Sequence, residues 1–300
     1  MMMGAAGQVG HGARVEPTRL AAAYAACARI ARTHYENFTI GSWLLPRRLR
    51  NDLAAVYAFA RGADDLADEG RASGQTRLDR LRDWEERLAA CAREPAAAAD
   101  AVFLALGHTI ARHDLPLAPF RDLLRAFRRD AAGETSTFAT FAELLDYCRC
   151  SANPVGRIVL GLFEECDAAR AARADDICTA LQLTNFWQDV AGDLVRGRVY
   201  VPQEDLERFA GSREALVARR ATPAFRQLLA FEVARTRDLF RRGLALGGMV
   251  SRSLAREVRL FAGGGLALLA RIEAVDYDVF GRRPKLTRGD LARVLLRGLW

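Results

Sequence analysis

Hydrophobic positions recur every three or four residues along almost the whole chain, whereas runs that alternate apolar and polar residues are essentially absent. The first spacing is typical of helices with one buried face and the second of strands, so the pattern predicts an all-α protein. Only residues 197–202 have the pattern of a short strand or bend. The expected helices cover residues 18–35, 46–69, 75–93, 98–113, 117–130, 141–166, 172–195, 213–219, 222–246, 254–273 and 288–299.

Domain organisation follows from the same pattern. Residues 1–17 are small and polar without periodicity, which predicts a disordered leader. Residues 18–300 contain no linker rich in proline, glycine or serine, which predicts a single all-α domain of about ten helices. Residues 53–60 and 177–187 are mostly apolar around the helix and are predicted to lie inside the bundle.

Composition narrows the class of protein. The net charge of the chain is +7. Its basic residues are one lysine, Lys285, and arginines that stand beside acids along the chain. A protein that follows a nucleic-acid backbone would concentrate its basic residues around aromatic ones, so nucleic acid is not an expected partner. Apolar runs fall short of the roughly 20 residues of a spanning helix, and the start of the chain lacks the apolar core of a secretory signal. We therefore expect a cytoplasmic chain.

The cysteines and histidines indicate no metal site of their own. The six cysteines form no C-x-x-C pair and several stand in apolar helical segments, so we expect reduced, structural thiols. The four histidines form no H-E-x-x-H pattern, so zinc is not expected.

A first group of acids follows the apolar segment at 53–60. Tyr57, Arg61, Asp64 and Asp68 are separated by four, three and four residues, which places them along one face of a helix, with Asp65 beside them. Carboxylates four residues apart repel one another, and the repulsion grows in a bundle interior unless a cation or hydrogen bonds compensate it. The stripe therefore needs a partner.

A second group repeats this arrangement in residues 172–195. Gln182, Asn185, Asp189 and Asp193 again share one helix face. Two such helices can present oxygen ligands across a cavity, and oxygen-only sites favour Mg²⁺ or Mn²⁺ bound together with phosphate oxygens. The spacing alone leaves two interpretations about equally open: a metal–diphosphate site, or solvated acids on helix surfaces.

The segments YAFARGADDLAD (57–68) and LQLTNFWQDVAGDLVRGRVYVP (181–202) resemble the two aspartate-rich motifs of the squalene/phytoene synthase family. This resemblance implies an isoprenoid-synthase bundle around a central apolar cavity. NFTIGSWLLPRRLR (37–50), NFWQD (185–189) and SANPVGR (151–157) resemble the bacterial hydroxysqualene synthase branch of hopanoid biosynthesis. That branch converts presqualene diphosphate into hydroxysqualene and diphosphate, whereas its sister branch makes presqualene diphosphate from two farnesyl diphosphates.

The resemblance also implies roles for individual residues. The Mg²⁺ ligands, with Mn²⁺ as an alternative ion, would be Asp64, Asp65, Asp68, Asp189 and Asp193. The catalytic residues would be Tyr57, Arg61 and Tyr200. The isoprenoid diphosphate would contact His34, Asn37, Phe38, Arg61, Gln182, Asn185 and Arg198.

Ionisation of such a substrate leaves a carbocation, which Phe38, Phe186 and Trp187 are expected to stabilise by cation–π contact. No G-x-G-x-x-G pattern follows a strand, so no nicotinamide cofactor is expected and water capture is favoured over hydride transfer.

Three segments depart from the family pattern. Gln188 stands where phytoene synthases usually carry arginine, which predicts less positive charge there. Thr137 and Phe138 replace an Arg-Tyr pair. Pro154, after Asn153, is expected to kink a long helix.

Two alternatives stay open: a prenyltransferase that joins two allylic diphosphates into presqualene diphosphate or a phytoene-like product, and a non-catalytic helical assembly protein. The lipophilic product favours transient contact with the inner membrane face, for which the amphipathic residues 290–300 are a candidate, and functional coupling to neighbouring hopanoid-pathway enzymes.

Overall fold

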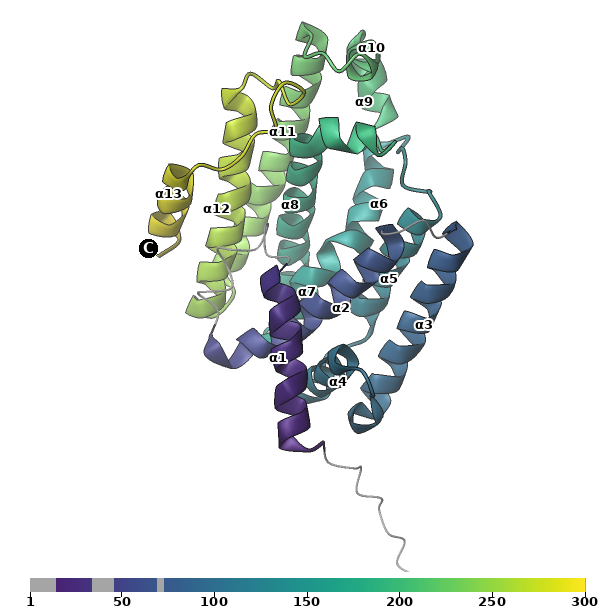
Figure 1. Cartoon of the computed structure of the whole chain (residues 1–300). Coiled ribbons are helices and arrows are strands. Elements are labelled where there is room, and N and C mark those ends of the chain that lie inside the picture. Colours follow the sequence, from purple (N-terminus) through teal and green to yellow (C-terminus); the bar gives the residue numbers. More distant parts are fainter. Residues whose placement is uncertain (1–14, 34–45, 69–72, 300) are drawn as a thin grey trace, which may run out of the picture.

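The computed structural model describes residues 15–33, 46–68 and 73–299, and these fold into a bundle of helices (Figure 1). Within them the pairing typical of strands is limited to an isolated bridge between Thr137 and Val199, so the all-α prediction is confirmed. The α-helices are α1 (Pro17–Thr33), α2 (Arg50–Asp68), α3 (Gly74–Arg93), α4 (Ala101–His113), α5 (Ala118–Ala131), α6 (Phe141–Ser151), α7 (Asn153–Leu162), α8 (Ala168–Val195), α9 (Gln203–Arg208), α10 (Ser212–Val217), α11 (Pro223–Gly243), α12 (Arg252–Ala274) and α13 (Arg288–Leu299). Short 3₁₀ helices cover Arg47–Leu49, Pro95–Ala97 and Leu244–Gly248.

Side-chain caps explain where several helices begin. Asp167 accepts a hydrogen bond from the backbone N–H of Arg170 at 2.8 Å, so α8 starts at residue 168, four residues before the predicted boundary. Thr222 caps α11 in the same way, and Pro223 occupies the first turn, where its missing N–H costs nothing.

The helix predicted over 141–166 is two helices. Ala152 leaves the helical region with φ −123° and ψ −49°, and Asn153 and Pro154 form the first turn of α7. The expected kink is therefore a break, because proline is better accommodated at the start of a new helix than inside an old one. The Asn153 Oδ1 accepts a hydrogen bond from Thr179 Oγ1 at 2.8 Å, which ties α7 to α8.

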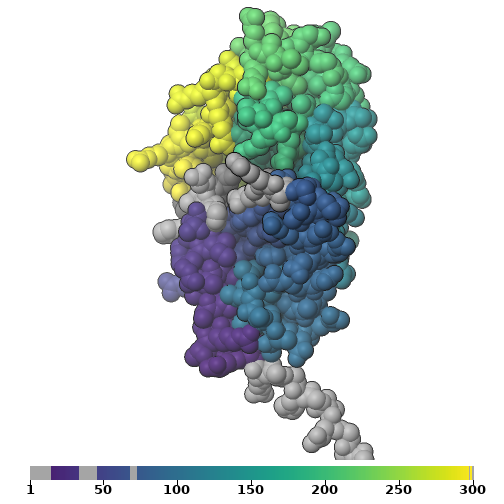
Figure 2. Space-filling view, turned by 45° about the vertical axis from the view of Figure 1, so that its right-hand side comes forward, coloured from purple at the N-terminus to yellow at the C-terminus, as the bar shows by residue number. Residues whose placement is uncertain are grey.

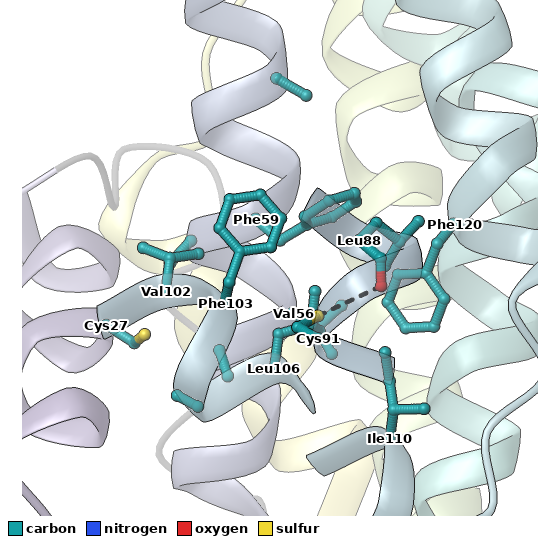
Figure 3. Packing of buried hydrophobic residues seen from close by; sticks show 14 of the residues in the cluster. Cys27, Val56, Phe59, Leu88, Cys91, Val102, Phe103, Leu106, Ile110 and Phe120 are labelled. Carbon is teal, nitrogen blue, oxygen red and sulfur yellow. Dashed lines mark hydrogen bonds between the residues drawn. The ribbon is translucent and has the colours of Figure 1, made fainter. Parts of the chain in front are cut away.

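A first hydrophobic cluster is formed mainly by α1–α5 (Figure 3). Phe59 of α2 lies edge-on to Phe103 and to Phe120, with ring centroids 6.1 and 5.8 Å apart. Cys27 and Cys91 are buried in this cluster as free thiols. The cluster fixes the inner face of α2, and with it the direction of the first acidic stripe.

A second cluster is formed mainly by α6, α8, α11 and α12. Trp187 of α8 is fully buried in it and donates its indole N–H to Thr236 Oγ1 of α11 at 2.8 Å. At Gly243 a Cβ would lie 2.5 Å from Ile177 Cγ1, so glycine is required for the close approach of α11 to α8. The opposite side of α8 reaches solvent at Asn185, so this helix is not buried all around as predicted.

None of the helices in the described ranges is both long and apolar enough to span a membrane.

Candidate active site

The first acidic stripe occupies the second half of α2. Arg61 places Nη1 3.2 Å from Asp64 Oδ2 and Nη2 2.6 Å from Asp65 Oδ1. Burial disfavours the charged guanidinium, but the two carboxylates outweigh it and raise the pKa of Arg61. Tyr57 is half-buried against the first cluster, and Asp68 is the last residue of α2. The arginine thus pairs with two acids of its own group.

In the second stripe Asp189 pairs with a residue far along the chain. Arg283 forms two ion-pair contacts with Asp189, one of them between Nη2 and Oδ2 at 2.7 Å. Gln188 holds the same segment, because its Nε2 donates to the Pro284 carbonyl at 2.5 Å while its Oε1 accepts from Arg283 Nη2 at 3.3 Å. The positive charge that Gln188 was predicted to lack is therefore supplied by Arg283.

Asp193 is the most enclosed of the described acids in the two motifs, with 8% of its surface exposed. Burial and the neighbouring charge of Asp189 raise its pKa to about 6. Its backbone carbonyl accepts the N–H groups of Arg196 and Arg198, both at 2.9 Å, and Gly197 turns the chain with φ 74°. This turn directs residues 198–202 back along α8 toward α6.

The returning segment covers Asp193 with aromatic rings. Tyr200 stacks on Phe186 of α8 with centroids 3.7 Å apart and planes 7° from parallel. Phe138 and Tyr147 extend the stack, so the Thr137-Phe138 departure contributes packing. Burial raises the pKa of Tyr200 although the charge of Arg198 opposes it, so the phenol is neutral at physiological pH.

The other predicted site residues are distributed unevenly. Gln182 is half-buried on α8 and Asn185 is exposed, while His34, Asn37 and Phe38 lie outside the described residues. Trp187 is fully buried in the second cluster, where Thr236 accepts its N–H, and its cation–π role stays a prediction.

Sequence reasoning missed several residues that complete the site. Arg283 stands in a GRRP segment that no spacing argument links to Asp189, since 94 residues separate them. Tyr147 donates its hydroxyl to Asp130 at 3.1 Å beneath the aromatic stack. The sequence offered no signal for that pair beyond helical periodicity.

The donor set suits a divalent cation, although no three His, Cys, Asp or Glu side chains come close enough to hold one within the described ranges. Carboxylate oxygens are ligands that Mg²⁺ prefers, and Asp64 and Asp189 are partly open to solvent. A cation beside Asp193 would also remove the repulsion that raises the pKa of this acid. The chemistry of these donors therefore suits such an ion, while arginines provide the counter-charge in this arrangement.

The chain is similar to known proteins over most of its length. The family model described as squalene/phytoene synthase matches residues 31–290. The chain is 33% identical over 283 residues to 15-cis-phytoene synthase of Synechococcus elongatus, covering 88% of each chain. The crystal structure of squalene synthase HpnC from Alicyclobacillus acidocaldarius is similar with a TM-score of 0.81 and 44% identity, over 87% of this chain and 97% of that one. A ligand-bound dehydrosqualene synthase gives a TM-score of 0.84 at 26% identity, over 94% and 97% of the two chains.

Proposed function

The chain belongs to the squalene/phytoene synthase family, as its motifs predict, and from that premise we propose that it converts presqualene diphosphate and water into hydroxysqualene and diphosphate. The family processes isoprenoid diphosphates. The observation that carries the choice of reaction is the 44% identity to squalene synthase HpnC over nearly the whole of that chain, against 33% to a phytoene synthase.

In the proposed reaction the bond between carbon and the diphosphate oxygen breaks, and the diphosphate leaves with the electron pair. The carbocation rearranges, water adds through its oxygen, and a proton is released. Two guanidinium groups, Arg61 and Arg283, would bind the leaving group, because their planar forks match phosphate oxygens. Arg198, in the segment that covers Asp193, would add a third cation near the second stripe.

Mg²⁺, held by Asp64, Asp68, Asp189 and Asp193 with Asp65 in an outer role, would neutralise the diphosphate charge as the bond breaks. The arginines that pair with Asp64 and Asp189 would then be released toward the substrate. The stacked rings of Phe186 and Tyr200 would line the enclosed side and exclude water until the cation has rearranged.

A second candidate function is the joining of two allylic diphosphates to presqualene diphosphate or phytoene. The similarity to phytoene synthases over most of the chain favours it. The third alternative, an assembly protein without catalysis, is less favoured because both acidic stripes keep their arginine partners.

Incubation of the purified protein and Mg²⁺ with presqualene diphosphate, and separately with farnesyl diphosphate, distinguishes the three. Hydroxysqualene from the first substrate alone supports the proposal. Presqualene diphosphate or phytoene-type product from allylic diphosphates assigns the prenyltransferase function instead. No turnover of either substrate favours the assembly role.

Asp189→Asn is expected to lower kcat/KM with the productive substrate by about 100-fold or more, because the amide cannot balance a divalent cation. The matched control is Asp176→Asn, on the same helix as Asp189. It removes a carboxylate that pairs with Arg173 of α8 and Arg242 of α11. Rates are measured at saturating Mg²⁺. Equal rates in the two variants would rule out the ligand role of Asp189.

We also propose that the enzyme acts at the cytoplasmic surface of the inner membrane and is coupled there to neighbouring hopanoid-pathway enzymes. A hydroxysqualene product is far more soluble in lipid than in water, which supports delivery at a bilayer surface.

A further inference from the structure

The helix α13 lies at the outer edge of the bundle beside α12 (Figure 1). It buries Val294 next to Gly263, where a Cβ would stand 3.4 Å from Val294 Cγ1. On its other side Leu295 and Leu296 are 36% and 61% exposed. The C-terminal part of the chain also projects from the surface in the space-filling view (Figure 2). α13 therefore packs with one face and presents adjacent leucines with another.

On the side of α13 that carries Val294, a groove of about 760 Å³ runs between α11, α12 and α13. Its floor consists of the small residues on one face of α12: Gly263, Ala267, Ala270 and Ala274. The stretch of α12 that lines it, residues 259–274, is about 22 Å long at 1.5 Å per residue. This exceeds the roughly 15 Å that one leaflet contributes to the hydrocarbon core of a bilayer. The groove is thus long enough for an acyl chain.

The rim of the groove is basic. Four arginines line it: Arg237, Arg259, Arg271 and Arg293. Arg237 pairs with Glu273, whereas Arg271 and Arg293 share Asp290. The four arginines of the rim therefore face two carboxylate partners. Arg259 contacts the Gly298 carbonyl at 3.4 Å instead of an acid.

The same asymmetry holds for the whole C-terminal segment. Residues 252–300 contain ten basic and five acidic residues, which gives this segment +5 of the +7 net charge of the chain. Basic residues outnumber acidic ones two to one here. An acidic partner is therefore complementary to this face.

We propose that α13 and the arginine-rimmed groove, together called the C-terminal face, dock onto an anionic phospholipid bilayer. Leu295 and Leu296 enter the interface, one acyl chain occupies the groove, and the arginines lie at the level of the lipid phosphates. An exposed apolar helix edge joined to a basic rim binds such surfaces reversibly, by apolar burial and by charge attraction. This docking extends the proposed function. It rests on the proposed function only for the reason why the protein would bind a membrane, namely the release of a lipophilic product.

The test measures binding of the full-length protein, without substrate, to sedimented vesicles of phosphatidylcholine alone or mixed equally with phosphatidylglycerol. Wild type is expected to bind the mixed vesicles, with binding falling as salt screens the charges. The double variant Leu296→Asp/Arg288→Gln is expected to lose about tenfold or more of the partition coefficient, since it removes an apolar side chain and the exposed charge of Arg288, the first residue of α13.

The matched control is Val217→Asp/Arg219→Gln on the exposed end of α10, where Val217 is 79% exposed. Retained binding of this control with loss in the α13 variant supports the proposal. Equal binding of both variants, or equal binding to the two vesicle types, overturns it. A wild-type dimer that the Leu296→Asp/Arg288→Gln variant breaks into monomers also overturns it, since a second copy would then cover the face.

Turnover of detergent-dispersed substrate separates this inference from the proposed function. The α13 variant is expected to keep the wild-type rate in micelles. If wild type turns over no diphosphate yet binds anionic vesicles, the proposed function fails and the docking face stands.

Discussion

Two buried carboxylates show how differently single residues can be accommodated in this protein. Asp52 is fully buried but accepts hydrogen bonds from Tyr24 at 3.1 Å and Thr109 at 3.2 Å, and it lies 3.2 Å from His113 Nε2. Glu257 of α12 is 2% exposed, and neither carboxyl oxygen has a hydrogen-bond partner. Burial therefore raises the pKa of Glu257 to about 7. Partners decide whether a buried acid stays ionised.

Glu257→Gln is expected to change how stability depends on pH. The folded pKa of about 7 exceeds the ordinary 4.5, so the folded state holds a proton that the unfolded state releases. The contribution of the neutral Glu257 carboxyl group to the free energy of unfolding is fully present below pH 4.5 and is lost as pH rises through 7. The amide of the variant stays neutral at both pH values. The free energy of unfolding of the variant minus that of wild type should therefore be about 1–3 kcal/mol larger at pH 8 than at pH 4.

Urea unfolding of both proteins at the two pH values checks this expectation. Glu207→Gln is the control, because the Glu207 side chain is 74% exposed. An unchanged difference between wild type and the Glu257 variant across this pH range would contradict the neutral, buried state of the acid.

Helices α6, α9 and α11 meet at a single guanidinium. Arg235 of α11 pairs with Asp205 of α9 at 2.7 Å and with Glu232 of its own helix, and it lies 3.5 Å from the ring centroid of Phe141 in α6. Both carboxylates are buried. The three helices frame the segment that carries Tyr200, so this contact supports the covered side of the site.

Arg235→Met is expected to lower the free energy of unfolding by about 3–5 kcal/mol, because the buried Asp205 loses its counter-charge and the buried Glu232, whose pKa burial raises to about 8, loses its hydrogen-bond donor. Arg241→Met on the same helix is the control. Its partner Asp238 and Arg241 itself are both exposed, so a change within about 0.5 kcal/mol is expected. Denaturant unfolding of both variants at pH 7 measures the difference. A similar small change in both would show that Asp205 and Glu232 tolerate the loss.

At the scale of the whole molecule, the two acidic stripes are supported by different hydrophobic clusters. α2 is anchored in the first cluster and α8 in the second, and α7 packs between them against α8. The contact of α7 with α8 is close at Gly156, where a Cβ would lie 2.8 Å from Cys178 Sγ. The relative position of the stripes therefore depends on this junction.

Gly156→Val is expected to lower the free energy of unfolding by about 1–3 kcal/mol through overpacking, and to lower kcat/KM more than stability alone explains. Gly264→Ala is the control: a Cβ there meets nothing within 4 Å, so a gain of about 0.5–1 kcal/mol is expected. Thermal unfolding and turnover are measured on the same preparations. Unchanged turnover in a folded Gly156→Val variant would contradict the role of the junction.

The sequence predicted the local features of this molecule well and the long-range ones poorly. Helical periodicity located α2 and the acidic face of α8, because spacing along one helix fixes which side chains share a face. It could not show that Arg283 meets Asp189, since nothing in local spacing encodes a tertiary contact. The break before Asn153 was missed as well, because proline in a helical pattern is compatible with either a kink or a new start.

The contact between Arg283 and Asp189 has a consequence for synthesis of the protein on the ribosome. Chains emerge from the N-terminus, and early segments fold before later ones exist. The first stripe carries its own arginine, and in the second Asp193 pairs with Arg196 three residues on, whereas Asp189 waits for a partner made 94 residues later. Until residue 283 has been translated, Asp189 of the nascent polypeptide lacks this counter-charge, and a stop codon before that position would leave it so permanently.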